Sequence, residues 1–272
     1  MHLLPLLLYA AAAATYIAHF AWRDPRVGRL ATSLIAGAVL AHTFLIGMQT
    51  VQAGHAPLVG TSAAISAFVW LLGLSYLYVE LTSDERSMGS FVAVLLVALY
   101  VIPALNPAVS PRPPVLQSPL FTVHVMSLLF AYASFALACV LGITYALLFK
   151  EIKAKQLGFF YTRLPPLASL DLMNSRAVTV GWVFLTIGVV VGGIWAWQVK
   201  GSPDPRVQAM SVADPKILVA LVSWGIYSFA LFARKAAGWS GRRAAYLSGI
   251  AFAIVLLNFV LVGYFLTVSH NF

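Results

Sequence analysis

Eight long apolar segments, separated by short polar loops, constrain this sequence more than any other feature. Each one approaches or exceeds the roughly 20 apolar residues that a helix needs to cross the hydrocarbon core of a bilayer. Because a chain in lipid must satisfy its own backbone hydrogen bonds, these segments predict transmembrane helices. The predicted spans are residues 3–22, 30–51, 62–80, 88–106, 121–149, 178–198, 216–233 and 245–268. The expected fold class is all-α, a polytopic membrane helical bundle of about eight transmembrane helices.

The composition excludes the other broad classes of protein. Hydrophobic side chains make up 61% of the 272 residues and charged ones only 9%, far below the roughly 25% of soluble domains. A chain this apolar is also unlike a disordered protein, which buries little and carries much charge. No repeat of fixed period and no low-complexity linker divides the sequence, so residues 1–272 are expected to form a single integral membrane domain.

Positive charge is distributed unevenly between the loops. If the loop after the first span is cytoplasmic, all but four of the 17 lysines and arginines fall on the cytoplasmic side. The exceptions are Arg112, Lys200, Arg206 and Lys216. This bias follows the positive-inside rule and predicts that the N- and C-termini both lie outside. The net charge of +9 therefore indicates topology and not binding to nucleic acid.

The histidines are the main candidates for metal or proton chemistry, because the single cysteine, Cys139, has no partner for a disulfide or redox pair. His42 falls near the middle of the second span, where an ionisable group is costly and usually functional. The alternative is a neutral imidazole that hydrogen-bonds to a neighbouring helix. The others are placed near the ends of spans or in loops: His2, His19, His55, His124 and His270.

His124 and His270 stand out because both are predicted at the outer surface, where two imidazoles can ligate one metal. For surface histidines the simpler alternative is a pair of solvated side chains. Small residues follow His124 at steps of three or four and predict a close helix contact, so His124 is expected to point into the bundle. They are Ser127, Ala131, Ser134, Ala138 and Gly142. Gly188 and Gly192 predict a similar contact on the sixth span.

Three tryptophans surround the longest outer loop, residues 199–215. Trp195 and Trp197 precede this loop, and Trp224 follows it within the next span. Tryptophan at this level is commonly an anchor at the membrane interface. The alternative is an aromatic platform for an apolar ligand.

Several stretches resemble the cytochrome c assembly family of CcsA, CcmC and HemX-type membrane proteins. The most specific is GWSGRRAAYL at residues 238–247, preceded by DPK and a tryptophan-containing helix. The stretches AGHAPLVGTSAAISAFVW and HVMSLLFAYASFALACVLGITYALLF resemble the family upstream. The resemblance covers about residues 40–270. It implies a multi-pass protein of the bacterial plasma membrane, in which the charge bias predicts that both termini lie on the periplasmic side.

The resemblance also implies a function in handling haem. Family members bind haem at the outer membrane face, between helices that flank a tryptophan-rich WWD segment, with two outer histidines as axial ligands. His124 and His270 match these ligands by position, Trp195, Trp197, Trp224 and Asp214 match the segment, and His55 matches a further histidine motif. The expected cofactor is non-covalent b-type haem. The expected partners are a membrane-anchored cytochrome c assembly protein, apocytochrome c, or both, and the expected role is that of a carrier or chaperone more than an enzyme.

The sequence also departs from the family pattern. Ile217 replaces the acidic residue after DPK, residues 201–212 are an insertion in the loop, and Phe232 stands where assembling members have a further histidine. Since a phenylalanine cannot ligate iron, haem transfer across the membrane by that route is not expected. These departures favour a divergent or HemX-like member, and they keep a haem-independent scaffold or regulator as the alternative. A small-solute transporter is suggested by His42 alone.

Overall fold

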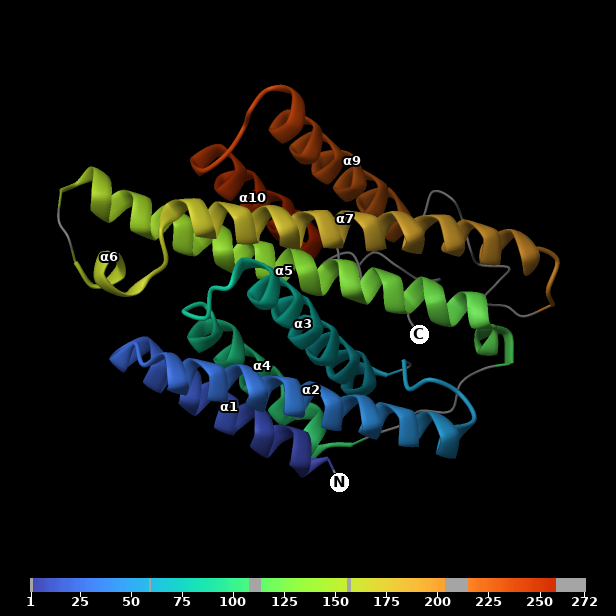
Figure 1. Ribbon diagram of the computed structural model, residues 1–272. Helices are drawn as coiled ribbons and strands as arrows, with labels where there is room; N and C mark the ends of the chain where they lie inside the picture. The colour runs from blue at the N-terminus through green and yellow to red at the C-terminus, as the bar shows by residue number, and fades with distance from the viewer. Residues whose placement is uncertain (1, 59, 108–113, 156–157, 204–214, 258–272) are drawn as a thin grey trace.

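The structure is a computed structural model that describes residues 2–58, 60–107, 114–155, 158–203 and 215–257. Regular structure in these residues is entirely helical, which confirms the all-α prediction (Figure 1). The helices are α1 (Leu3–Trp22), α2 (Pro25–Ala53), α3 (Thr61–Ser83), α4 (Gly89–Leu105), the 3-10 turn η1 (Pro114–Gln117), α5 (Pro119–Lys153), α6 (Phe159–Arg163), α7 (Leu167–Gln198), α9 (Pro215–Ala236) and α10 (Arg242–Leu257).

Each of the eight predicted spans overlaps one of these helices, and residues 258–268 of the last span lie outside the described residues. Six helices are long and apolar enough to cross a membrane, namely α1, α2, α3, α5, α7 and the Ile217–Ala236 part of α9. The helix α4 is apolar but shorter, with 17 residues. The helix α10 is described as far as Leu257. The predicted polytopic helical bundle is thus confirmed.

A long antiparallel pair, α5 and α7, runs through the middle of the molecule (Figure 1). Helices α1 to α4 pack together on one side of this pair, with α3 in contact with α5. Helices α9 and α10 pack on the other side. The chain is therefore built around one central seam, the contact surface between α5 and α7.

Small residues on α5 allow the neighbouring helices α3 and α10 to approach it closely. Ser127, Ala131, Ser134 and Ala138 are buried on α5, and the hydroxyls of Ser134 and Ser75 of α3 share a hydrogen bond at 2.7 Å. A Cβ atom on Gly142 would come within 2.7 Å of the backbone oxygen of Ala245 on α10. The predicted close contacts along α5 are confirmed, because larger side chains would not fit there.

The helix α7 begins at Leu167, well before residue 178, where the apolar span was expected to start. Its first turns mix polar and charged residues with apolar ones, so a hydropathy pattern does not mark them as part of a span. Asn174 donates a hydrogen bond to the Ala138 carbonyl at 2.7 Å. Asp171 forms an ion pair with Arg234 and accepts from the Gly241 backbone at 2.8 Å. Tertiary contacts thus stabilise the polar extension of this helix.

The short helix α6 connects the second half of the chain to its beginning. Arg163 donates hydrogen bonds to the carbonyl oxygens of Phe20, at 2.9 Å, and Ala21, at 2.6 Å, in the last turn of α1. The last carbonyls of a helix have no partner within the helix itself, so a guanidinium satisfies them well.

Candidate functional site

His124 lies in the second turn of α5, with its imidazole against α7. The ring nitrogen Nδ1 is 2.7 Å from the carbonyl oxygen of Gly188. Gly192, one turn further along α7, borders the same ring. The prediction that His124 points into the bundle is confirmed by these contacts.

The two glycines of α7 make this approach possible. A Cβ atom on Gly188 would come within 2.7 Å of the Leu128 side chain, and one on Gly192 within 2.4 Å of His124 Nδ1. Both positions therefore need the absence of a side chain. The predicted close contact at this glycine pair is confirmed, and it forms the space that the imidazole occupies.

The contact with Gly188 determines which nitrogen of His124 carries the proton. A carbonyl oxygen only accepts hydrogen bonds, so Nδ1 must be the donor. In the neutral ring Nε2 then carries the lone pair, which is the form that ligates a metal. Histidines that ligate metals usually donate their other N–H to a carbonyl or carboxylate in this way. The chemistry of His124 therefore fits an iron ligand.

Trp195 lies on the same side of α7 as the glycine pair. Its ring is only 4% exposed and contacts Phe121, one turn before His124, with a centroid distance of 5.0 Å. Leu116 of η1 completes this small cluster. The buried Nε1 of Trp195 has no acceptor within the described residues. Trp195 and His124 thus lie one turn apart in the seam of α5 and α7.

The other two tryptophans do not join this pair. Trp197 is 76% exposed at the end of α7. Trp224 of α9 donates a hydrogen bond to Thr186 Oγ1 at 2.9 Å and stacks on Trp182. Thr186 and Gly188 are two residues apart, about 200° around the helix, so Trp224 and His124 contact opposite sides of α7.

Two of the predicted site residues, His270 and Asp214, lie outside the described residues. Arg112 and Arg206 also lie outside them. Within the part of the chain that the structure describes, there is no group of three or more His, Cys, Asp or Glu side chains that could hold a metal ion. Of the two predicted metal ligands, His124 and His270, the structure therefore describes only His124 and its surroundings.

His42 forms a separate polar centre on the other side of the bundle. Its ring is fully buried. Nδ1 lies 3.3 Å from the hydroxyl of Tyr9 on α1, and Nε2 lies 2.9 Å from Oγ of Ser66 on α3. The ring of Tyr100 on α4 packs against it at 4.5 Å. Both ring nitrogens are thus engaged, as expected for an imidazole that holds neighbouring helices together.

His55 and Phe232 are the remaining positions that the sequence singled out. His55 lies in the turn between α2 and α3, and its Nδ1 is 3.2 Å from the carbonyl oxygen of the next residue, Ala56. Phe232 is 67% exposed on α9 and faces away from the packed helices. Neither side chain contacts the seam that holds His124.

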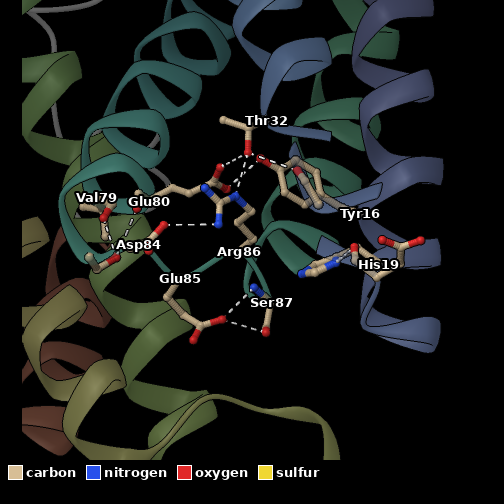
Figure 2. A network of polar contacts seen from close by, with 12 residues as sticks. Tyr16, His19, Thr32, Val79, Glu80, Asp84, Glu85, Arg86 and Ser87 are labelled. Carbon is tan, nitrogen blue, oxygen red and sulfur yellow. Dashed lines mark hydrogen bonds and ion pairs between the residues drawn. The ribbon is translucent and has the colours of Figure 1, made fainter. Parts of the chain in front are cut away.

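The sequence analysis did not single out Glu80, a carboxylate buried between three helices (Figure 2). Tyr16 of α1 donates to its Oε2 at 2.6 Å, and Thr32 of α2 donates to its Oε1 at 2.5 Å. Arg86 donates to the Thr32 hydroxyl at 3.3 Å and pairs with Asp84 at 3.2 Å. Glu80 ends an apolar run, so the sequence suggested only a span boundary there. The cluster joins α1, α2 and α3 at their predicted inner ends.

The apolar helices and the central seam define a multi-pass membrane protein. The family described as "Cytochrome C assembly protein" matches residues 58–270. The chain belongs to this family. Its relatives include the cytochrome c biogenesis protein CcsA of Trieres chinensis, 25% identical over 94% of this chain and 90% of that protein. The CcsA protein of Guillardia theta is 24% identical over 86% of this chain and 82% of that protein. The CcsA protein of Synechococcus sp. (strain CC9311) is 26% identical over 83% of this chain and 82% of that protein.

Proposed function

We propose that this protein binds and handles haem for cytochrome c biogenesis, with His124 and His270 as the two axial ligands at the outer membrane face. The observation that carries the proposal is the hydrogen bond from His124 Nδ1 to the Gly188 carbonyl. It orients the imidazole and assigns the lone pair to Nε2, as haem ligation requires. Family membership supports the same assignment.

The residues around His124 have separate roles in this proposal. Gly192 leaves room for the imidazole. Trp195 packs against Phe121, one turn from His124, and covers that end of the seam. A bound haem is mostly apolar, so a site between helices at the membrane edge removes it from water. Trp197 is exposed at the end of the same helix and offers an apolar face at that edge. Asp214 and Trp224 complete the set of residues assigned by resemblance.

The protein acts as a carrier or chaperone in this proposal, and all 272 residues form one membrane domain. Its partners are a membrane-anchored assembly protein, apocytochrome c, or both. Any thioether bond to a cytochrome would use cysteines of that partner, because this chain has only Cys139. The membrane is the bacterial plasma membrane, with both termini on the periplasmic side.

A haem-independent scaffold or regulator is the second candidate. The observation that favours it is Phe232, which takes the position of a further histidine and turns its ring away from the bundle. A protein of this kind would keep the fold and bind an assembly partner without binding haem.

An absorption spectrum of the purified full-length protein separates these candidates. We expect a Soret band in the wild type that is lost in His124→Ala and strongly weakened in His270→Ala. His2→Ala serves as the matched control. His2 is also predicted at the outer face, and its side chain makes no capping hydrogen bond to α1, so its loss should not disturb the helix. Added imidazole should restore the band in His124→Gly, which distinguishes a lost ligand from a misfolded protein.

A colourless wild type that still co-purifies with an assembly protein would replace the haem carrier by the scaffold. A Soret band that survives in both His124→Ala and His270→Ala would show that haem is bound by other residues. A band that weakens equally in His2→Ala would also count against the assigned ligands.

A further inference from the structure

A basic hollow lies at the turn between α9 and α10, away from His124. Its volume is about 580 Å³, and it is lined by Gly238, Trp239, Ser240, Arg242, Arg243 and Tyr246. We propose that this hollow binds the phosphate headgroup of an anionic phospholipid.

Aromatic rings hold both guanidinium groups in place. Arg243 lies over the Trp239 ring at 5.4 Å from its centroid. Arg242 lies between Tyr246, at 5.4 Å, and Phe149 of α5, at 5.6 Å. An aromatic ring attracts the guanidinium through its π electrons and takes up no oxygen acceptor, so the N–H groups can still donate to an anion. Such groups donate paired hydrogen bonds to phosphate oxygens.

Among the described residues, no carboxylate forms an ion pair with the arginines of the hollow. In the described part of the chain, the ion pairs are Arg86 with Asp84 and Arg234 with Asp171. Neither Arg242 nor Arg243 takes part in them. Asp171 of α7 contacts this turn through the Gly241 backbone and is already paired with Arg234. An anion in the hollow would therefore meet two arginines that no described carboxylate pairs with.

The turn is held in shape before any ligand binds. Gly238 and Gly241 both have positive φ angles, of 64° and 60°, which favour glycine. The Trp239 backbone donates to the Ala233 carbonyl at 3.1 Å, and Gly241 is held by Asp171. The helix α10 starts at Arg242, so its positive end adds to the field in the hollow.

The surroundings favour a lipid over a soluble anion. Tyr246 and Ile250 lie one turn apart on α10 and are both exposed, as is Phe229 of α9. Acyl chains would lie along these apolar side chains while the phosphate occupies the hollow. The turn is on the side that the positive-inside rule predicts as cytoplasmic, and that leaflet carries anionic lipids.

Native mass spectrometry of the full-length protein in detergent tests the proposal. The probes are phosphatidylglycerol and phosphatidylcholine with the same acyl chains, and inorganic phosphate alone. The wild type is expected to retain phosphatidylglycerol in preference to phosphatidylcholine. The double variant Arg242→Gln, Arg243→Gln should bind phosphatidylglycerol about 30-fold more weakly, since each basic side chain near an anionic headgroup contributes about fivefold.

Two further variants make the outcome specific. Arg26→Gln, Arg29→Gln removes the same charge from exposed positions on the same predicted side of the membrane and should keep wild-type binding. Arg242→Lys, Arg243→Lys keeps the charge and should keep most of the lipid preference. Equal binding of the two lipids, or an equal loss in both glutamine double variants, would overturn the proposal. Displacement of phosphatidylglycerol by millimolar inorganic phosphate would show that the occupant is a soluble anion.

Discussion

Gly192 of α7 lies so close to His124 of α5 that a Cβ atom on the glycine would come within 2.4 Å of the imidazole Nδ1. Gly193, the next residue, has nothing within 4 Å of such a Cβ atom. These neighbouring glycines therefore provide a matched pair, in which only one substitution disturbs the histidine.

Gly192→Ala should displace the His124 ring and break its hydrogen bond to Gly188. We expect loss of most of the Soret band and a decrease of about 1–3 kcal/mol in stability, as for other overpacked sites. Gly193→Ala should retain both. Absorption spectra and thermal unfolding in detergent measure the two effects, and identical behaviour of the two variants would contradict the assigned contact.

Adding a methyl group at Gly142, where α5 contacts α10, should also destabilise the protein. Gly142→Ala would place a Cβ atom 2.7 Å from a backbone oxygen of Ala245, which no side-chain rotation can relieve. We expect destabilisation of about 1–3 kcal/mol in thermal unfolding. Gly249→Ala on α10 is the control, because no atom lies within 4 Å of its Cβ position. An unchanged melting temperature for Gly142→Ala would show that the helices are further apart.

The buried carboxylate of Glu80 should depend on its hydroxyl donors. Tyr16→Phe removes the donor to Oε2 and leaves a buried acceptor with one bond fewer, which costs about 1–3 kcal/mol. Tyr78→Phe on α3 is the matched control, since Tyr78 is about half exposed, and its cost should be near zero. Chemical unfolding followed by circular dichroism compares the two, and equal losses would argue against the hydrogen bond.

The predicted orientation in the membrane can be tested with engineered cysteines. In a Cys139→Ala background, Lys200→Cys should react with a membrane-impermeant thiol reagent applied to intact cells. Lys153→Cys, at the other end of the bundle, should react only after the cells are opened. Both lysines are exposed at helix ends, so accessibility alone does not separate them. The reverse pattern would place the termini inside.

Hydropathy and spacing predicted the helices and the faces that pack. The small residues that follow His124, and the pair Gly188 and Gly192, marked close contacts that the structure confirms. These features are visible in a sequence because they depend on the period of the helix and on side-chain size alone. The start of α7 at Leu167 was not visible, because the polar residues in its first turns are stabilised by partners from distant parts of the chain.

The details of the candidate site needed three-dimensional contacts. The sequence grouped Trp195, Trp197 and Trp224, but only Trp195 shares the seam with His124. The tautomer of His124 follows from a carbonyl 64 residues away, which no local pattern indicates. Glu80 was missed for the same reason, since its two hydroxyl donors come from other helices.

The bond from Arg163 to the end of α1 also bears on how the protein assembles during synthesis. Arg163 follows Ala21 by 142 residues, so the ribosome makes α1 long before it makes the guanidinium that caps this helix. Until α5 and α6 emerge, water or lipid headgroups must solvate those carbonyls. The C-terminal end of the first helix is therefore completed late, when the second half of the chain folds back onto it.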